Sequence, residues 1–328
     1  MFDPYTLPYA TGRRVAIVTG ANSGIGYYTT LHLYLHGYHV YLACRSEARA
    51  SHAIAGITAA AEQLAKTNTQ TVLGSLEYIS LDLNSLKQTE ETAEILKRKE
   101  PNGIDILINN AGVMAWPVTM TEDGYDIQSQ VNHIAPTLFT LKLIPLLLKS
   151  ADPRVVFVSS IGHFLNDGLG DLARTYDYWP VSFWGFLRYG NAKAAEIQTA
   201  KALAARYPTR ILFSSVHPGV CADTNLTHYY HDKPVLGAVI KGVFDATRWV
   251  GGISSEEGSY TSLYAALAPQ LTPEHDNGKF WRPWPHEAYV HPVADNSAKI
   301  EHTWQWTVRE LVRKGFLEQA EIDALTEF

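Results

Sequence analysis

Three glycines near the N-terminus, at positions 20, 24 and 26, constrain the fold of this chain more than any other feature. The apolar run over 14–19 predicts a buried strand, and the segment 25–36 predicts a helix that ends at Gly37. A glycine turn between them lets the backbone approach a phosphate, which then faces free N–H groups and the positive end of the helix dipole. Because the spacing differs from G-x-G-x-x-G, an ordinary glycine-rich turn is the alternative. The candidate phosphate contacts are Gly20, Asn22, Ser23, Gly24, Ile25 and Gly26.

Strand-like and helix-like segments alternate along the first two thirds of the chain. Strands are predicted over 15–19, 39–43, 76–81, 104–109, 154–159 and 211–217. This alternation predicts an α/β fold with a doubly wound parallel sheet of the Rossmann type. The 328 residues suffice for one large domain, and no linker, internal repeat or low-complexity block divides them.

Charge and cysteine content exclude several functional classes. The net charge is −6, so the chain lacks the basic balance expected of a nucleic-acid-binding protein. Two cysteines in a chain of this size predict a fold without disulfides in a reducing compartment. The first residues lack the pattern of a signal peptide, and no apolar run is long enough for an ordinary membrane-spanning helix. We therefore expect a cytoplasmic protein.

A second motif, Tyr189-Gly190-Asn191-Ala192-Lys193, lies on a helix predicted over 188–207. Its tyrosine and lysine are four residues apart, which places both on one helical face. A phenol has a pKa of about 10, and a nearby ammonium group favours the phenolate. The pair therefore suits a general acid or base near neutral pH. The alternative is a core tyrosine beside a solvated lysine.

Five further motifs follow the order of a known family: Asp82-Leu83, Asn109-Asn110-Ala111-Gly112, Asn132, Ser159-Ser160 and Pro218-Gly219-Val220. With the glycine loop and the Tyr-Lys pair, they make the sequence resemble the short-chain dehydrogenase/reductase superfamily from about residue 15 to about residue 224. Asn22-Ser23, Ala43-Cys44-Arg45 and the long serine-to-tyrosine interval resemble its retinol dehydrogenase-like branch. The resemblance extends to yeast members of that branch, at least one of which is associated with lipid droplets.

The resemblance implies hydride transfer between a nicotinamide cofactor and a hydrophobic small-molecule carbonyl or alcohol. It implies that Tyr189 is the acid/base, that Lys193 is its electrostatic partner and that Asn132 anchors a proton relay. The hydroxyl of Ser160 would hold the substrate oxygen, with Ser159 as the competitor for that role. Two alternatives remain: a non-catalytic nucleotide-binding scaffold on a lipid surface, and a sugar-nucleotide epimerase.

The end of the second predicted strand favours NADP(H). An NAD enzyme usually has an acidic residue there, whereas this chain has Ala43-Cys44-Arg45-Ser46. Arg45 can bind a 2′-phosphate through charge-assisted hydrogen bonds, unless it simply points to water. The resemblance implies that Asp82 contacts the adenine and that Asn109 lies beside the adenine ribose. It adds as cofactor contacts Leu83, Ala111, Gly112, Tyr189, Lys193, Pro218, Gly219, Val220 and Thr224.

Two spacings in the sequence differ from known motifs. Thr224, which by the resemblance would contact the nicotinamide amide, follows Gly219 by five residues, where the family often has four. His286 and His291 are five residues apart and do not form H-E-x-x-H, so no metal site is expected.

Three segments exceed what a minimal family member needs. The core covers about 14–224 within a single domain over 1–328, and the segment 162–187 inside it is rich in aromatic residues that suit a bulky apolar substrate. A lid is predicted over about 225–253, and its amphipathic stretch 235–244 is a lid helix, a lipid-contacting surface or one more core helix. A C-terminal extension over about 269–328 is predicted to pack against the rim. Peripheral contact with a lipid surface and a homodimer are compatible with the sequence.

Overall fold

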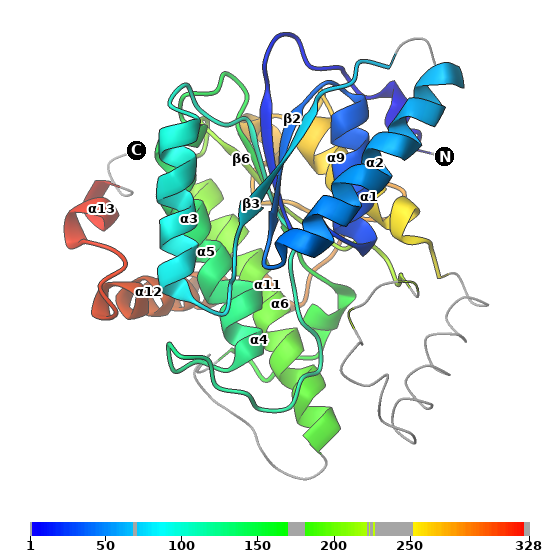
Figure 1. The fold of residues 1–328 in the computed structure, drawn as a ribbon. Helices are drawn as coiled ribbons and strands as arrows, with labels where there is room; N and C mark the ends of the chain where they lie inside the picture. Colours follow the sequence, from blue (N-terminus) through cyan, green and yellow to red (C-terminus); the bar gives the residue numbers. More distant parts are fainter. Residues whose placement is uncertain are drawn as a thin grey trace.

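The computed structural model describes residues 2–67, 71–169, 181–221, 223, 226 and 252–324. A sheet of eight strands crosses the molecule in the order β3-β2-β1-β4-β5-β6-β7-β8 (Figure 1). The strands are β1 (Val15–Thr19), β2 (His39–Cys44), β3 (Ser75–Ser80), β4 (Ile106–Asn109), β5 (Arg154–Val158), β6 (Leu212–Val216), β7 (Phe280–Arg282) and β8 (His286–Glu287). All pairings are parallel except that of β7 with β8. The predicted doubly wound parallel sheet is therefore confirmed.

Helices cover both faces of this sheet. Figure 1 shows α1 (Gly24–Leu35), α2 (Glu47–Thr67) and α9 (Ser255–Leu267) on one side, and α3 (Leu86–Lys99), α5 (Ala135–Leu147) and α6 (Val181–Arg206) on the other. A long C-terminal helix, α12 (Ser297–Arg313), packs on α6. The remaining helical elements among the described residues are short: η1 (Pro4–Thr6), α4 (Ile127–Ser129), η2 (Gln130–Ile134), η3 (Ile161–Phe164), α10 (Pro273–Asp276), α11 (Pro292–Asp295) and α13 (Gln319–Ala324).

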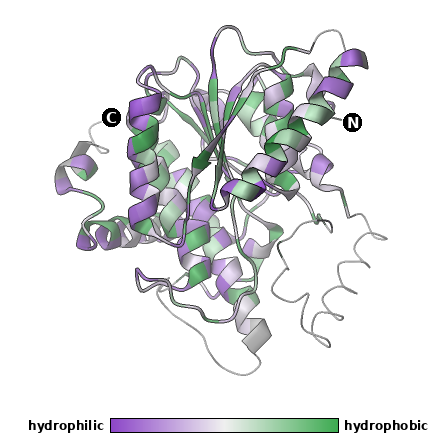
Figure 2. Ribbon diagram, viewed as in Figure 1, coloured by the Kyte–Doolittle hydropathy of each residue, from purple (hydrophilic) through white to green (hydrophobic). Residues whose placement is uncertain are grey.

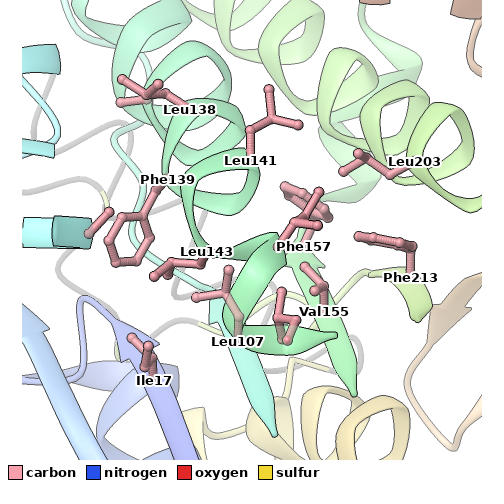
Figure 3. Close-up of a cluster of buried hydrophobic side chains, with 14 of the residues drawn as sticks. Ile17, Leu107, Leu138, Phe139, Leu141, Leu143, Val155, Phe157, Leu203 and Phe213 are labelled. Carbon is pink, nitrogen blue, oxygen red and sulfur yellow. The ribbon is translucent and has the colours of Figure 1, made fainter. Parts of the chain in front are cut away.

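The apolar strands are buried on both faces. Along β1, Val15 and Ile17 belong to the core beneath α5, whereas Ala16 and Val18 belong to the core beneath α1 and α9. Figure 3 shows the first core, where Leu107 and Phe157 of adjacent strands meet the leucines of α5. Strands covered on both faces have near-continuous apolar sequences, which explains why they were predictable. Figure 2 shows these apolar strands between helices whose sequences mix polar and apolar residues.

The C-terminal extension contributes a strand to the sheet and side chains to both cores. The prediction that it packs only against the rim of the domain is therefore wrong in part. Its strand β7 pairs with β6, and Trp281 is buried in the core beneath α1 and α9. Trp304 is buried in the opposite core, where the Arg206 guanidinium lies 4.2 Å from the centre of its ring. Trp284, between two prolines, remains 49% exposed. Strands β7 and β8 were not predicted because each is only two or three residues long.

The predicted lid falls largely outside the described residues. This applies to 227–251, including the stretch 235–244, and also to Thr224 and to 170–180 of the aromatic segment. The described residues at the two ends of the lid are joined: Ile253 N–H donates to Val220 O at 3.1 Å, and the Ser255 hydroxyl donates to Asp223 at 2.7 Å. The segment therefore leaves and rejoins the domain at one place, directly after Gly219. None of the helices described in this structure has the length and apolarity to cross a bilayer.

Candidate active site

A cleft of about 650 Å³ opens at the carboxyl ends of β1 to β4. It lies where the strand order leaves β1 toward β2 on one side and toward β4 on the other. Such a reversal is the usual ligand position in an open α/β sheet. Predicted cofactor residues that line it are Gly20, Asn22, Ser23, Gly24, Ile25, Gly26, Arg45, Asp82, Leu83, Ala111 and Gly112.

The glycine loop is shaped by close backbone contacts. Gly20 and Gly24 have φ angles of +65° and +55°, which disfavour other residues. A Cβ at Gly26 would lie 2.5 Å from both Gly20 O and Asn110 Nδ2. The loop therefore closes on itself and on the segment that follows β4, and the first residues of α1, Gly24 to Gly26, line the cleft. This cradle fits the pyrophosphate of a dinucleotide.

Two residues that the sequence analysis did not assign fix this loop in place. The Thr19 hydroxyl accepts hydrogen bonds from the N–H groups of Asn110 and Ala111, each at 2.9 Å. The Asn110 amide in turn donates to Thr19 O at 2.8 Å. Thr19 ends the first predicted strand and Asn110 belongs to the motif over 109–112, so polar side chains beside a glycine turn were the available signal. Asn109 differs: its side chain is buried, donates to Thr140 at 2.9 Å and does not line the cleft.

The end of β2 presents cationic side chains to the cleft. Arg45, directly after β2, and Arg49, in the first turn of α2, line it together with Ser46. Asp82, the carboxylate among the described lining residues, comes from the end of β3 and not from β2. Arg49 was missed by the sequence analysis, although its spacing from Arg45 would have indicated it.

Tyr189 and Ser160 meet beside this cleft. A Cβ at Gly162 would lie 2.9 Å from Tyr189 Cε1 and 3.3 Å from Ser160 Oγ, so these two side chains are close neighbours. Ser160 Oγ accepts a hydrogen bond from Gly162 N at 3.0 Å. Ser159 is oriented differently, because its hydroxyl donates to Lys193 O at 2.7 Å. Of the two serines, Ser160 is thus the one placed next to the tyrosine. Leu226, which lines the cleft, packs against the cluster formed by Tyr189 and Met114.

Lys193 connects the tyrosine to the cleft. Its Nζ lies 5.7 Å from the Tyr189 ring centre and 3.5 Å from where a Gly112 Cβ would be. Gly112 also faces Asn132, whose amide oxygen accepts from Val113 N at 2.8 Å and whose NH2 donates to Val113 O at 2.9 Å. Asn132 is fully buried in η2, a π-helical turn that interrupts the regular helix. Asn132 thus fixes Gly112 and Val113, two residues of the cleft wall that follow β4, next to Lys193.

A buried carboxylate, Glu196, accompanies Lys193. Lys193 Nζ donates to Glu196 Oε1 at 2.9 Å and to Val158 O at 2.8 Å. Burial raises the pKa of Tyr189 above its ordinary value; Lys193 and the Ser160 hydroxyl lower it, and Glu196 raises it. The sequence predicts that the lysine brings the pKa of Tyr189 down, but in the structure burial outweighs the effect of the lysine.

A second buried ion pair anchors the residue before the tyrosine. Arg188 Nε lies 3.5 Å from Asp126 Oδ2, and Arg188 Nη2 donates to Trp116 O at 2.7 Å. Trp116 lines the cleft, so this arginine ties the start of the tyrosine segment to the cleft wall. Burial raises the pKa of Asp126, and Arg188 opposes that shift.

Two histidines position the turn that carries Ser160. His217 Nδ1 accepts from Ile161 N at 3.2 Å and from Gly219 N at 3.4 Å. His163 Nδ1 lies 2.6 Å from Ser160 O. Pro218, Gly219 and Val220 therefore join the serine turn to the start of α9 and do not line the cleft.

The described residues offer no cluster of three or more metal-ligating side chains, and Cys44 and Cys221 are both free and buried. His286 and His291, the pair considered above, do not share a helix: His286 is in β8 and His291 precedes α11.

Known proteins share both sequence and fold with this chain. A family model described as short chain dehydrogenase matches residues 14–167. An uncharacterized oxidoreductase of Schizosaccharomyces pombe is 33% identical over 308 residues, covering 92% of this chain and 85% of that protein. Retinol dehydrogenase 14 of Homo sapiens is 31% identical over 303 residues, covering 91% and 86%. A solved structure from Mycobacterium paratuberculosis aligns with a TM-score of 0.69 and 25% identity, covering 94% of this chain and 97% of that one.

The predicted resemblance to yeast members associated with lipid droplets stays a prediction.

The matches to the family model and to relatives over nine tenths of the chain agree with the glycine cradle and the Ser-Tyr-Lys arrangement described above. This protein belongs to the short-chain dehydrogenase/reductase family of oxidoreductases, which use a nicotinamide cofactor, and within that family it is similar to the retinol dehydrogenase-like branch.

Proposed function

We propose that this protein is an NADP(H)-dependent oxidoreductase that interconverts a hydrophobic ketone or aldehyde and its alcohol. The observation that carries the proposal is that Tyr189 lies next to Ser160, with Lys193 close to both the tyrosine ring and Gly112 of the cofactor cleft. Each of these side chains has a task in moving a proton to or from a substrate oxygen.

The preference for NADP(H) rests on charge at the end of β2. Arg45 and Arg49 can form charge-assisted hydrogen bonds to a 2′-phosphate, and Ser46 adds a hydroxyl beside them. The described lining residues include no carboxylate from the end of β2 that would repel that phosphate. When bound, the cofactor supplies or accepts the hydride.

The proton chemistry belongs to the side chains. In the reductive direction, the Tyr189 hydroxyl donates its proton to the substrate oxygen, and Ser160 donates a hydrogen bond to the same oxygen. The Lys193 ammonium offsets the negative charge that Tyr189 then carries. In the oxidative direction, Tyr189 accepts the alcohol proton. Asn132 positions the segment Gly112-Val113 against Lys193.

An apolar substrate is supported by what surrounds Tyr189. Met114, Phe186 and Leu226 pack around it, and Trp116 lines the adjoining cleft. The similar human protein is named for retinol, an apolar alcohol.

The test is a panel of ketones and aldehydes of increasing apolar length, supplied with NADPH or NADH and followed by loss of reduced-cofactor absorbance. We expect consumption of NADPH with long apolar carbonyls. Tight NADPH binding without turnover of any carbonyl would favour the scaffold alternative. Conversion of a sugar nucleotide without net cofactor consumption would favour the epimerase.

A further inference from the structure

The mechanism above leaves unused the buried carboxylate behind the catalytic lysine. Glu196 is 2% exposed and Lys193 is 3% exposed, and their Oε1 and Nζ atoms are 2.9 Å apart. The other carboxylate oxygen, Oε2, is buried and has no hydrogen-bond partner among the described residues. A buried carboxylate with one unpaired oxygen lowers the stability of the fold, because water no longer solvates that oxygen. Such a group therefore suggests a function.

We propose that Glu196 is the counter-ion of Lys193, and that its charge keeps the proton on Tyr189 and so adapts the site to carbonyl reduction. The inference rests on the proposed function, in which Tyr189 is the acid. Glu196 acts through Lys193 and is a positioning residue.

The net charge near the Tyr189 phenol determines how readily it loses its proton. Lys193 alone presents one positive charge to Tyr189, which favours the phenolate. An ionised Glu196 in contact with that ammonium cancels much of its field. Tyr189 then retains its proton to higher pH, and a protonated phenol is what reduction requires.

The order of ionisation agrees with this geometry. Burial raises the pKa of Glu196, whereas the Lys193 ammonium group at 2.9 Å lowers it and favours the carboxylate. Burial also raises the pKa of Tyr189, which is ordinarily about 10. As the pH rises, Glu196 therefore becomes negative before Tyr189 would lose its proton.

Other charged groups around α6 are neutral or paired elsewhere. His133 of η2 and His163 of η3 are buried with lowered pKa values, His133 to about 3, so they are neutral near pH 7. Charged side chains on α6 and on the elements packed against it pair with one another: Arg188 with Asp126, Lys201 with Asp295, Arg206 with Glu301, Arg154 with Asp152, and Arg313 with Glu310. Among the described residues, Lys193 is the charged group that lowers the pKa of Glu196.

The test is a phenolate titration that needs neither substrate nor cofactor. Ultraviolet difference absorbance is recorded against pH for the parent protein and for Glu196→Gln, each compared with its own Tyr189→Phe counterpart to isolate Tyr189. Glutamine keeps the shape and still accepts from Lys193, but it removes the charge. We expect the Tyr189 midpoint to fall by about one pH unit. Coincident midpoints, or a rise, would overturn the proposal.

Three companion variants make the outcome decisive. Glu196→Asp retains the charge and should keep the midpoint near that of the parent. Glu301→Gln removes a carboxylate that pairs with Arg206 on the same helix, and it should leave the midpoint unchanged. If Glu196→Gln does not fold, Glu196→Met removes the charge with an apolar chain, and the same fall is expected.

Activity then separates this inference from the proposed function. With a carbonyl that the panel identifies, the alkaline limb of the reductive kcat/KM profile should move down by the same amount in Glu196→Gln. A shifted phenolate midpoint in a protein that turns over no carbonyl would support the counter-ion and refute the proposed function.

Discussion

The cofactor cleft and the tyrosine site beside it are built by different means. The cleft is formed by glycines with left-handed backbone, and by neutral hydrogen bonds between Thr19 and Asn110. The tyrosine site depends on two buried ion pairs, Lys193 with Glu196 and Arg188 with Asp126. A backbone cradle tolerates no added Cβ, whereas a buried pair tolerates no loss of one partner. The two regions should therefore respond to different substitutions.

The largest effect is expected on the turnover rate, with little change in cofactor affinity. Tyr189→Phe should lower turnover by about 10²–10⁴, because a positioned acid/base is removed, and should change NADPH affinity only a few-fold. Steady-state rates and fluorescence titration measure the two effects. Tyr264→Phe, distant in sequence and packed on Trp281, is the matched control with unchanged turnover. Near-normal activity of the Tyr189 variant would remove the tyrosine from the mechanism.

A substitution at the end of β2 should alter cofactor choice and nothing else. We expect the parent protein to bind NADPH at least about tenfold more tightly than NADH, or about 1.4 kcal/mol, and Arg45→Asp to reverse that order. Fluorescence titration with both cofactors measures the ratio. Arg98→Asp, on the exposed side of α3, controls for the change in net charge. Equal affinities in the parent protein would contradict the role of Arg45.

The cradle itself can be tested by adding a single carbon. Gly26→Ala places a Cβ 2.5 Å from two polar atoms, so the loop must shift. We expect NADPH affinity to fall about tenfold, or about 1.4 kcal/mol. Gly56→Ala, in α2 and facing the flexible Tyr27 side chain, is the control and should leave affinity unchanged. An unchanged affinity in Gly26→Ala would mean that the loop is not the phosphate site.

The smallest effect concerns the helix that supports the cradle. His32 in α1 is buried, and neither ring nitrogen has a hydrogen-bond partner among the described residues; burial lowers its pKa to about 3. The unfolded chain gains that proton near pH 6.5 while the folded chain does not, so stability is lost as the pH falls below about 6.5. His32→Phe should raise the free energy of unfolding by about 1 kcal/mol at neutral pH and reduce this acid sensitivity.

Thermal unfolding at about pH 7 and about pH 5 measures both changes in His32→Phe. NADPH affinity should be unchanged, because His32 lies one to two turns beyond the cradle. A changed affinity would show that the helix body, and not only its first turn, shapes the phosphate site.

The same contrast explains what the sequence could predict. The six central strands and the glycine loop were predictable, because the strands are apolar on both faces and the loop is specified by local glycines. Glu196 and Asp126 were not recognised, since a carboxylate in a helix or turn is ordinarily solvated. Their burial depends on packing between segments far apart in the chain. The C-terminal extension, which contains Trp281, was predicted to pack on the rim because nothing in its local sequence reveals that β7 pairs with β6.

The pairing of β7 with β6 has a consequence for synthesis of the chain. The edge of β6 is covered only when residues 279–281 arrive, through bonds such as His217 N to Trp281 O at 2.7 Å. A ribosome that has made the first six strands therefore holds a nascent chain with an open, apolar β edge. Such edges recruit other strands and promote aggregation. Chaperone dependence and co-translational misfolding should therefore be most acute in the interval between completion of β6 and emergence of β7.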